Sequence, residues 1–271
     1  MLRQLGSGGY GAVYEVEHTL THNRHALKVL HPSEAQSASS AERLIREAGV
    51  AGRVGSARLV TTLDVGQLED GRTFILMALL EGQSWRDLLK AQGHLHPKDA
   101  VRLAIQVCEG LAAAHAAGVV HRDLKPDNVF LVGPRGSEAV KILDFGLARN
   151  LPGHTDEFGA ITSAGGLLGT PHYVSPEQGR GRPDVDGRAD QYALGVMLYE
   201  SLSGKRPFAE ATISALVVKI IQGDYHPLDR VAPYLPPDLT RVVHRAIHCD
   251  RDQRFPSAGA MGDALRGLED V

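Results

Sequence analysis

The sequence predicts an α+β fold built from two parts of unequal size. Alternating apolar and polar residues, the pattern of half-buried strands, dominate the first 80 of its 271 residues. Beyond Gly82 the apolar residues recur instead at the spacing of helices. We therefore expect a small β-rich part with one helix, followed by a larger and mainly helical part, with the two joined near residues 78–82.

The small part is expected to hold four strands and one helix. Apolar residues at positions 41, 44, 45 and 48 predict the helix over residues 41–54. A turn-like stretch at 69–71 separates the last two strands. The expected strands cover residues 12–17, 25–30, 59–65 and 73–80.

The larger part is expected to hold several helices. Each is predicted from apolar residues that recur at helical spacing. Short strands and loops rich in Gly, Pro and Asp are expected between residues 116 and 190. The expected helices lie at residues 101–115, 192–202, 213–221 and 239–247.

Composition and charge exclude several classes of protein. The chain has 29 Lys and Arg against 32 Asp and Glu, which argues against a nucleic-acid-binding protein held by general basicity. Its two cysteines are too few for a disulfide framework and indicate a reducing compartment. No apolar run reaches the ~18 residues that a membrane span needs. We therefore expect a cytoplasmic domain.

A glycine-rich motif near the N-terminus is the first candidate for ligand binding: Gly6-Ser7-Gly8-Gly9-Tyr10-Gly11. Glycines let backbone N–H groups approach phosphate oxygens with no Cβ in the way. The sequence continues as a strand rather than a helix, which argues against a dinucleotide-binding fold, and it contains no P-loop motif. The alternative is a plain turn, because 30 of the 271 residues are glycine.

Two charged residues of the small part form a candidate pair. Lys28 lies among apolar residues of a predicted strand and needs a counter-charge. Glu47, on the predicted helix, is the acidic residue that could supply it. The alternatives are a lysine that extends to solvent at a sheet edge and a solvated glutamate.

Two polar motifs in the larger part carry the chemistry. Residues 121–128, His-Arg-Asp-Leu-Lys-Pro-Asp-Asn, place a candidate carboxylate base, a lysine and a carboxamide in one loop. Asp144 follows a short predicted strand and begins an Asp-Phe-Gly motif. Asn128 and Asp144 together offer oxygen ligands of the kind that Mg²⁺ prefers, with water and phosphate oxygens to complete its coordination.

Taken in order, these motifs resemble the eukaryotic-type serine/threonine protein kinase domain, in the form found in bacteria. Residues 169–177, Gly-Thr-Pro-His-Tyr-Val-Ser-Pro-Glu, are similar to the kinase segment that ends in Ala-Pro-Glu, with Ser175 in place of alanine. The Ser-Pro-Glu-Gln run at 175–178 resembles bacterial members. Lys125 favours the serine/threonine class over tyrosine kinases.

The resemblance extends from Gly6 to about Phe255 and implies one kinase domain over residues 1–271. It implies a bilobal fold, with a small antiparallel β-sheet N-lobe that carries one helix (1–80) and a larger, mainly α-helical C-lobe (81–271). The implied activity is transfer of the ATP γ-phosphoryl group to Ser or Thr hydroxyls of proteins. Three residues are implied to have structural roles: Glu177, Asp190 and Arg254. Arg254 is implied to pair with Glu177.

The resemblance also implies a role for each polar motif. Lys28 pairs with the ATP phosphates and is held by Glu47. The implied metal ligands are Asn128 and Asp144, for Mg²⁺ or, as the alternative, Mn²⁺. The implied residues of the acceptor site are Asp123, which takes the hydroxyl proton, and Lys125, which neutralises the transferring phosphoryl. The residues implied to bind ATP are Leu5, Gly6, Gly8, Gly11, Val13, Ala26, Lys28, Leu79, Leu80 and Phe130.

Regulation is expected in the loop between Asp144 and Glu177. Arg122 beside the catalytic aspartate suggests pairing with a phosphorylated residue of this loop. The candidate residues are Thr162 and Ser163, with Thr170 as a further hydroxyl. The expected partners are protein substrates, with autophosphorylation or a transient dimer as further options.

Three alternatives remain open at the level of sequence. A catalytically inactive pseudokinase scaffold would lose at least one of the four key residues Lys28, Asp123, Asn128 and Asp144, and all are present. A small-molecule kinase of related fold is disfavoured by residues 169–177, which resemble a peptide-docking platform. A metal site formed by histidines 244 and 248 lacks the glutamate of the His-Glu-x-x-His motif.

Overall fold

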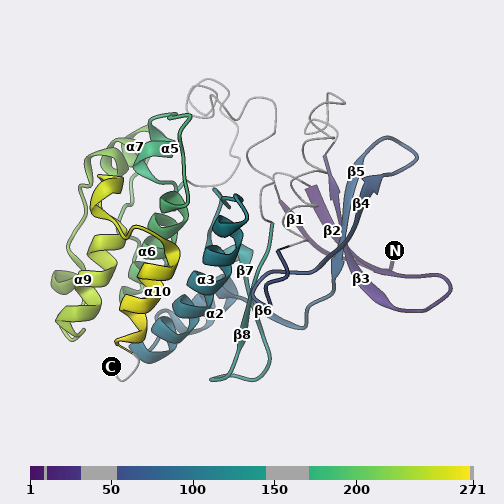
Figure 1. Ribbon diagram of the computed structural model, residues 1–271, viewed down its shortest axis with the longest axis horizontal. Helices are drawn as coiled ribbons and strands as arrows, with labels where there is room; N and C mark the ends of the chain where they lie inside the picture. Colours follow the sequence, from purple (N-terminus) through teal and green to yellow (C-terminus); the bar gives the residue numbers. More distant parts are fainter. Residues whose placement is uncertain (9–10, 32–53, 145–170, 269–271) are drawn as a thin grey trace.

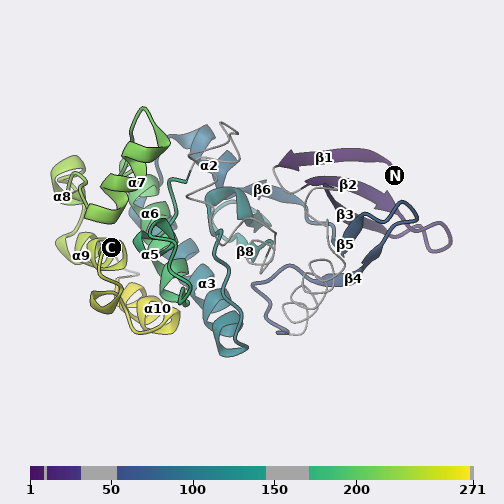
Figure 2. The same cartoon turned by 90° about the horizontal axis from the view of Figure 1, so that it is seen from above.

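Two lobes lie side by side along the long axis of the molecule, a sheet at one end and a group of helices at the other (Figure 1). The computed structural model describes residues 1–8, 11–31, 54–144 and 171–268. We call the part that ends at Ala78 the N-lobe and the part that begins at Gly82 the C-lobe. The view from above shows the same separation (Figure 2), so the predicted bilobal α+β fold is confirmed.

The N-lobe is a five-stranded antiparallel sheet. Its strand order is β1-β2-β3-β5-β4, so each strand except the edge strands pairs with two neighbours. Ala26, Leu30, Ile75 and Met77 form its small buried core. The strands are β1 (Arg3–Gly8), β2 (Gly11–Glu17), β3 (Arg24–Leu30), β4 (Thr62–Gln67) and β5 (Thr73–Ala78).

Three of the four expected strands are confirmed to within two residues at each end, and the fourth begins later than expected. Strand β4 begins at Thr62 rather than at residue 59. The backbone just before it pairs with the C-lobe instead: Val60 N–H donates to the Ile142 carbonyl at 3.0 Å, and Leu59 belongs to the C-lobe core, while the Val60 side chain packs against the N-lobe core. Strand β1 was not among the expected strands, and the helix expected over residues 41–54 lies almost entirely outside the described residues.

The C-lobe begins with a small antiparallel sheet that lies between the N-lobe and the helices (Figure 2). Its order is β6-β7-β8. Its strands are β6 (Gly82–Ser84), β7 (Val129–Val132) and β8 (Ala139–Ile142). Strands β7 and β8 are short strands of the kind that the sequence predicts between residues 116 and 190, whereas β6 was not expected. Strand β7 directly follows the loop that holds Asp123.

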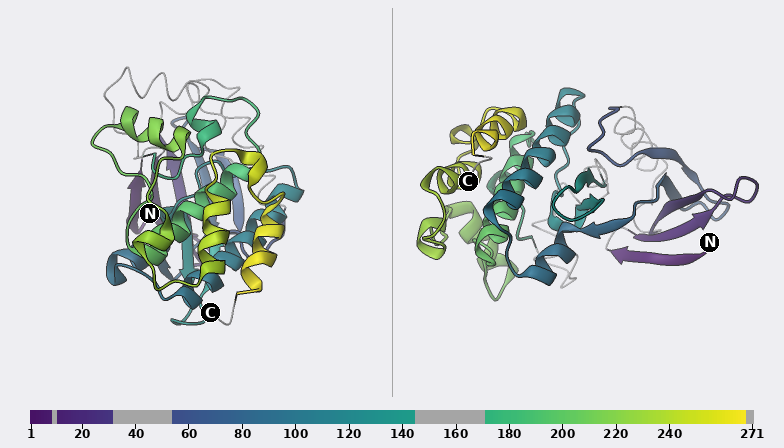
Figure 3. Two further views of the ribbon diagram at one scale, coloured as in Figure 1. Left: turned by 90° about the vertical axis from the view of Figure 1, so that its left-hand side faces the viewer. Right: turned by 90° about the horizontal axis from the view of Figure 1, so that it is seen from below.

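The helices of the C-lobe surround α6, whose residues are buried on nearly every side. Helix α3 packs against both α6 and α10, as the views from the end and from below show (Figure 3). The longer helices are α2 (Trp85–Gln92), α3 (Pro97–Ala116), α6 (Arg188–Ser203), α7 (Ile213–Gln222), α9 (Pro237–Ala246) and α10 (Ala258–Arg266). The short ones are α5 (Pro176–Gly179), α8 (Leu228–Val231) and the 3-10 turns η2 (Pro126–Asn128) and η4 (Arg251–Gln253).

The four expected helices of the C-lobe are confirmed, and α2 and α10 were not expected. Helix α2 begins with the only tryptophan, Trp85, which is fully buried and donates from Nε1 to Ser201 Oγ at 3.0 Å. This long-range bond orients α2 on α6, and no local pattern in the sequence signals it. Both cysteines are free thiols. Among the described residues, no helix combines the length and apolarity that crossing a membrane requires.

Candidate active site

The loop between α3 and β7 is held by a buried carboxylate from α6. Asp190 is 1% exposed, and its side chain accepts the backbone N–H groups of His121 at 2.9 Å and Arg122 at 2.8 Å. It also contacts His115 Nε2 at 2.7 Å. Arg122 has a φ of 66°, a left-handed conformation that costs of order 1–3 kcal/mol outside glycine. The Asp190 bonds stabilise that conformation at the residue before Asp123.

Three side chains of this loop meet at Asp123. Lys125 Nζ lies 2.7 Å from Asp123 Oδ2. Asn128 Nδ2 donates to the Asp123 carbonyl at 2.8 Å and to its Oδ2 at 3.3 Å. The Asp123 and Lys125 side chains are each about one-third exposed. A carboxylate, an ammonium group and a carboxamide therefore lie within contact distance, and solvent or a substrate can reach them.

Lys28 and Asp144 connect the two lobes. Lys28 on β3 is 6% exposed at its side chain, and its Nζ lies 2.7 Å from Asp144 Oδ1. Burial acts to raise the pKa of Asp144, but the charge and hydrogen bond of Lys28 more than offset it and hold that pKa below its ordinary value. Asp144 has a φ of 58°, a second strained residue at this site. The carboxylate is therefore ionised and fixed in place at neutral pH.

The donor atoms of Asn128 and Asp144 suit a magnesium ion. Leu143 N–H donates to the Asn128 carbonyl at 2.8 Å, which places Asp144 beside Asn128. Because Asn128 Nδ2 bonds Asp123, its Oδ1 is the atom left for another ligand. Mg²⁺ is commonly held by one or two protein oxygens together with phosphates and water. The side chains fit that requirement, and the described residues hold no cluster of three His, Cys, Asp or Glu for a protein-only metal site.

Apolar residues from both lobes line the region beside the 78–82 connection. Val13 and Leu79 pack on the N-lobe core that contains Ala26 and Met77. From the C-lobe, Phe130 lies against Gly82, since a Cβ built on that glycine would lie 3.3 Å from the Phe130 ring. Met77 pairs with Ala26 in the sheet register, and sequence analysis missed it. Its signal is the alternation of buried residues along β5.

The remaining predicted positions of this region are more open. The hinge residues Leu79 and Leu80 are half-buried, and Leu5 on β1 is 40% exposed. Within the described part of the chain, neither Leu79 nor Leu80 donates its backbone N–H to another residue.

The described glycines of the motif lie at the end of β1 and the start of β2, and they differ in what they require. Gly8 pairs with Gly11 across these two strands. Gly11 has a φ of 156°, and a Cβ there would lie 2.2 Å from the Val29 carbonyl oxygen of β3. At Gly6, no atom of the described residues lies within 4 Å of such a Cβ. Close packing of the sheet therefore requires glycine at Gly11, whereas the described residues leave the space beside Gly6 open to a ligand.

Several predicted residues lie outside the described residues: Glu47, Thr162, Ser163 and Thr170. Of the regulatory group, Arg122 is described, and its Nη2 donates to the Val185 carbonyl at 3.2 Å. The histidines at 244 and 248 do not form a metal site with each other. His244 Nε2 accepts the Leu228 N–H at 2.9 Å, and His248 bonds the backbone of Asp250.

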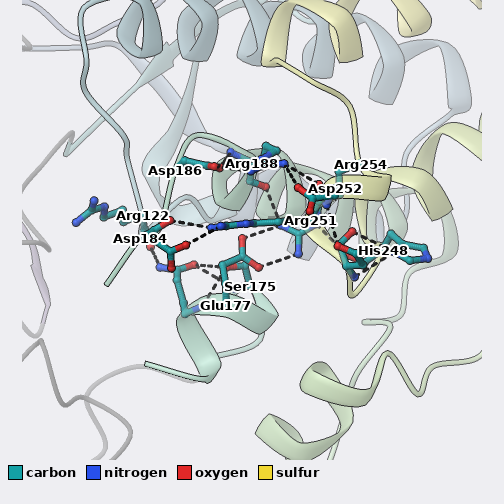
Figure 4. A network of polar contacts seen from close by, with 12 residues as sticks. Arg122, Ser175, Glu177, Asp184, Asp186, Arg188, His248, Arg251, Asp252 and Arg254 are labelled. Carbon is teal, nitrogen blue, oxygen red and sulfur yellow. Dashed lines mark hydrogen bonds and ion pairs between the residues drawn. The ribbon is translucent and has the colours of Figure 1, made fainter. Parts of the chain in front are cut away.

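The structure brings Glu177 and Arg254 together in a buried bidentate pair. Their side chains are 3% and 0% exposed, and both N–O distances are 2.8 Å. Arg254 also donates to the carbonyls of Arg188 and His248 and lies over the Tyr192 ring. Arginine and aspartate side chains of neighbouring segments surround this pair (Figure 4). The pair anchors α5 to the segments that hold Arg188 and His248.

A second polar cluster, which was not predicted from the sequence, is centred on Arg86 of α2 and contacts the loop of residues 121–128, the catalytic loop. Its guanidinium contacts Asp127 at 3.3 Å and Glu200 at 3.0 Å, and it also bonds the hydroxyl of Tyr173. Burial raises the pKa of Tyr173, which stays neutral. These residues come from four separate segments, so no spacing in the sequence could have indicated the cluster.

Comparisons with known proteins agree with this geometry. The protein kinase domain family matches residues 1–264. The serine/threonine-protein kinase Pkn1 of Myxococcus xanthus is 38% identical over 98% of this chain and 37% of its own length. The serine/threonine-protein kinase PknD of Mycobacterium tuberculosis is 36% identical over 99% of this chain and 40% of its own length. The chain thus spans about a third to a half of the length of such relatives.

A solved structure shares the fold. The crystal structure of the Mycobacterium tuberculosis PknI kinase domain aligns with a TM-score of 0.75 and 28% identity. The alignment covers 98% of this chain and 93% of that domain. A family match over nearly the whole sequence and a shared bilobal architecture lead to one conclusion. The chain belongs to the protein kinase family.

Proposed function

We propose that this chain is the catalytic domain of a serine/threonine protein kinase, which transfers the γ-phosphoryl group of ATP to Ser and Thr hydroxyls of proteins. The observation that carries the proposal is the arrangement of Lys28 with Asp144 and of Asp123 with Lys125 and Asn128. The names of the bacterial relatives support the class of acceptor. A pseudokinase scaffold is disfavoured, because no member of this set is replaced.

ATP is proposed to bind between the lobes. Its adenine would lie between Val13 and Ala26 above and Phe130 below, and its edge would bond the backbone near Leu79 and Leu80. The glycine motif, with open space at Gly6, would cover the phosphates. Lys28 would contact the α- and β-phosphates, and Glu47 would hold that lysine.

Asn128 and Asp144 are proposed to hold Mg²⁺, with Mn²⁺ as the alternative ion. When bound, the ion neutralises charge on the phosphate oxygens. The protein contributes fixed ligands, because Asn128 is held by Asp123 and Asp144 by Lys28. Such fixed charges need no reorganisation during the reaction, which is the largest source of rate enhancement in this chemistry.

Asp123 and Lys125 are proposed to act on the transfer itself. Asp123 would orient the acceptor hydroxyl and take its proton. The acceptor oxygen forms a bond to the γ-phosphorus, while the bond from that phosphorus to the bridging oxygen breaks and ADP leaves. Lys125 would balance charge on the transferring group. Positioning and charge carry the rate, because the transfer needs little covalent assistance.

Regulation, partners and location complete the proposal. Phosphorylation at Thr162 or Ser163, or at Thr170, would place a charge that Arg122 can bind. Autophosphorylation or a transient dimer would deliver that phosphate. A cytoplasmic location fits an ATP-dependent enzyme with two free thiols.

The decisive test compares wild type with Asp123→Asn for phosphate transfer from labelled ATP to myelin basic protein in the presence of Mg²⁺. Removing the proposed base should lower kcat by about 10²–10⁴-fold. The matched control is Asp127→Asn, the same substitution at an exposed carboxylate of the same loop. Absence of transfer by wild type, with nucleotide binding retained, would favour the scaffold alternative.

A further inference from the structure

The side chain of Gln178 connects α5 to the catalytic loop. Its Nε2 donates to the carbonyl of Arg122 at 2.8 Å, across 56 positions of sequence. Arg122 directly precedes Asp123, the proposed base. Helix α5, which carries Gln178, is itself fixed by the buried ion pair of Glu177 with Arg254. The contact therefore runs from a rigid anchor to the peptide group beside the reacting carboxylate.

With the Gln178 bond, both backbone polar groups of Arg122 are hydrogen-bonded to side chains. The N–H of Arg122 donates to Asp190 of α6 at 2.8 Å, and its carbonyl accepts from Gln178 of α5. Both polar groups of a residue in the left-handed conformation are thus held by side chains from separate helices. Because the Arg122 carbonyl belongs to the peptide unit that leads into Asp123, its orientation helps to set where the Asp123 carboxylate points.

Glutamine suits this place because it donates and accepts at once. Gln178 Oε1 accepts the backbone N–H of Ser175 at 3.1 Å and lies 3.0 Å from its hydroxyl, while Nε2 bonds Arg122. Ser175 Oγ in turn caps α5 at the Gln178 N–H. Ser175 stands where the kinase segment that ends in Ala-Pro-Glu has alanine. Its hydroxyl belongs to a capping box at the start of α5, in which Gln178 is the other member.

We propose that Gln178 is a positioning residue for phosphoryl transfer, which sets the geometry of Asp123 by holding the Arg122 carbonyl. The inference rests on the proposed kinase function. Gln178 is not a catalytic residue, because its contacts are with Arg122 and Ser175 rather than with the reacting groups. Its loss should therefore change the rate of transfer while leaving nucleotide binding intact.

The informative variant is Gln178→Glu. The new carboxylate can still accept from Ser175 and suits the first turn of a helix, but it has no donor for the Arg122 carbonyl. We expect kcat to fall about tenfold, because one hydrogen bond is lost and the new carboxylate repels the Arg122 carbonyl oxygen. The KM for ATP should stay within about twofold of wild type, and the Tm within about 2 °C.

Ser175→Ala is the matched control, with the opposite pattern. It removes the helix cap and the hydroxyl contact to Gln178 Oε1, but the backbone N–H of Ser175 still donates to that oxygen, and Nε2 still donates to the Arg122 carbonyl. Because loss of a cap destabilises a helix, we expect the Tm to fall by about 2–4 °C. We expect kcat to stay within about twofold of wild type. Equal kcat in Gln178→Glu and wild type would overturn the proposal, as would a Tm loss large enough to account for lost activity.

Hydrogen exchange of the peptide over residues 119–125 gives a readout that does not depend on activity. Faster exchange in Gln178→Glu than in wild type and Ser175→Ala is the expected result. Unchanged exchange in this peptide would contradict the claim that Gln178 holds the Arg122 carbonyl in place. If wild type shows no more transfer than Asp123→Asn, the proposed function fails, and the exchange measurement still decides whether Gln178 holds the loop.

Discussion

At the scale of single residues, buried polar groups of this domain differ in how fully they are bonded. Arg254 is fully buried, and its guanidinium bonds Glu177 and two backbone carbonyls. His172 is 8% exposed, and among the described residues its Nδ1 has no hydrogen-bond partner. Burial and the nearby charge of Arg206 lower the pKa of His172 from 6.5 to about 4. The folded protein therefore holds this ring neutral.

This neutral histidine predicts how stability depends on pH. Between about pH 6.5 and pH 4 the unfolded chain binds a proton at His172 that the folded protein does not bind, so the free energy of unfolding falls as pH is lowered. The loss reaches about 3 kcal/mol at most. His172→Gln, measured by urea unfolding across this range, should flatten the curve. His94→Gln, at an exposed histidine, is the control. A variant that keeps the wild-type slope would contradict the assignment.

At the scale of elements, the backbone of residues 58–60 docks on the C-lobe, although the Val60 side chain packs against the N-lobe core. The backbone of this segment pairs with Ile142 of β8 on both sides, and Leu59 packs in the C-lobe core. Helix α3 makes room for it with Gly110, where a Cβ would lie 2.7 Å from the end of the Ile142 side chain and 3.0 Å from Arg58 Cβ. This close approach is what fixes the segment against the helix.

Gly110→Ala tests that close approach. Overpacking at this point should lower the free energy of unfolding by about 1–3 kcal/mol, measured by urea denaturation. The matched control is Gly259→Ala in α10, where, among the described residues, the new Cβ would meet only Ser257 Oγ at 3.6 Å. There, better helix propensity should raise stability by up to about 1 kcal/mol. If both substitutions stabilise the protein, the 58–60 segment can move away from α3 at little cost, and the close packing at Gly110 does not fix it.

At the scale of the whole molecule, three connections between the lobes lie within the described residues. They are the 78–82 crossing, the docking of residues 58–60 on β8, and the contact of Lys28 with Asp144. The proposed ATP site uses residues on both sides of this junction. A nucleotide bound there contacts both lobes at once, so its binding energy adds to the stability of the folded protein.

Mg²⁺ and ATP should therefore raise the Tm in a way that depends on Lys28. At about 100 times the Kd, binding adds about 2.7 kcal/mol, or a shift of about 5–10 °C. Lys28→Met should lose most of this shift, as measured by differential scanning fluorimetry. Asp123→Asn should keep it, because Asp123 is proposed to contact the acceptor rather than the nucleotide. An undiminished shift in Lys28→Met would place the nucleotide elsewhere.

The sequence by itself determined the class of fold, most strands and helices, and the polar residues that meet at the site. Lys28, Asp123, Asn128 and Asp144 could be named because each belongs to a short motif, and the strands because burial alternates along them. Tertiary structure decided the rest. The bond of Gln178 to Arg122, the cluster around Arg86 and the place of residues 58–60 join segments far apart in the chain. Periodicity reports only local geometry, so contacts between distant segments become visible only after the chain has packed.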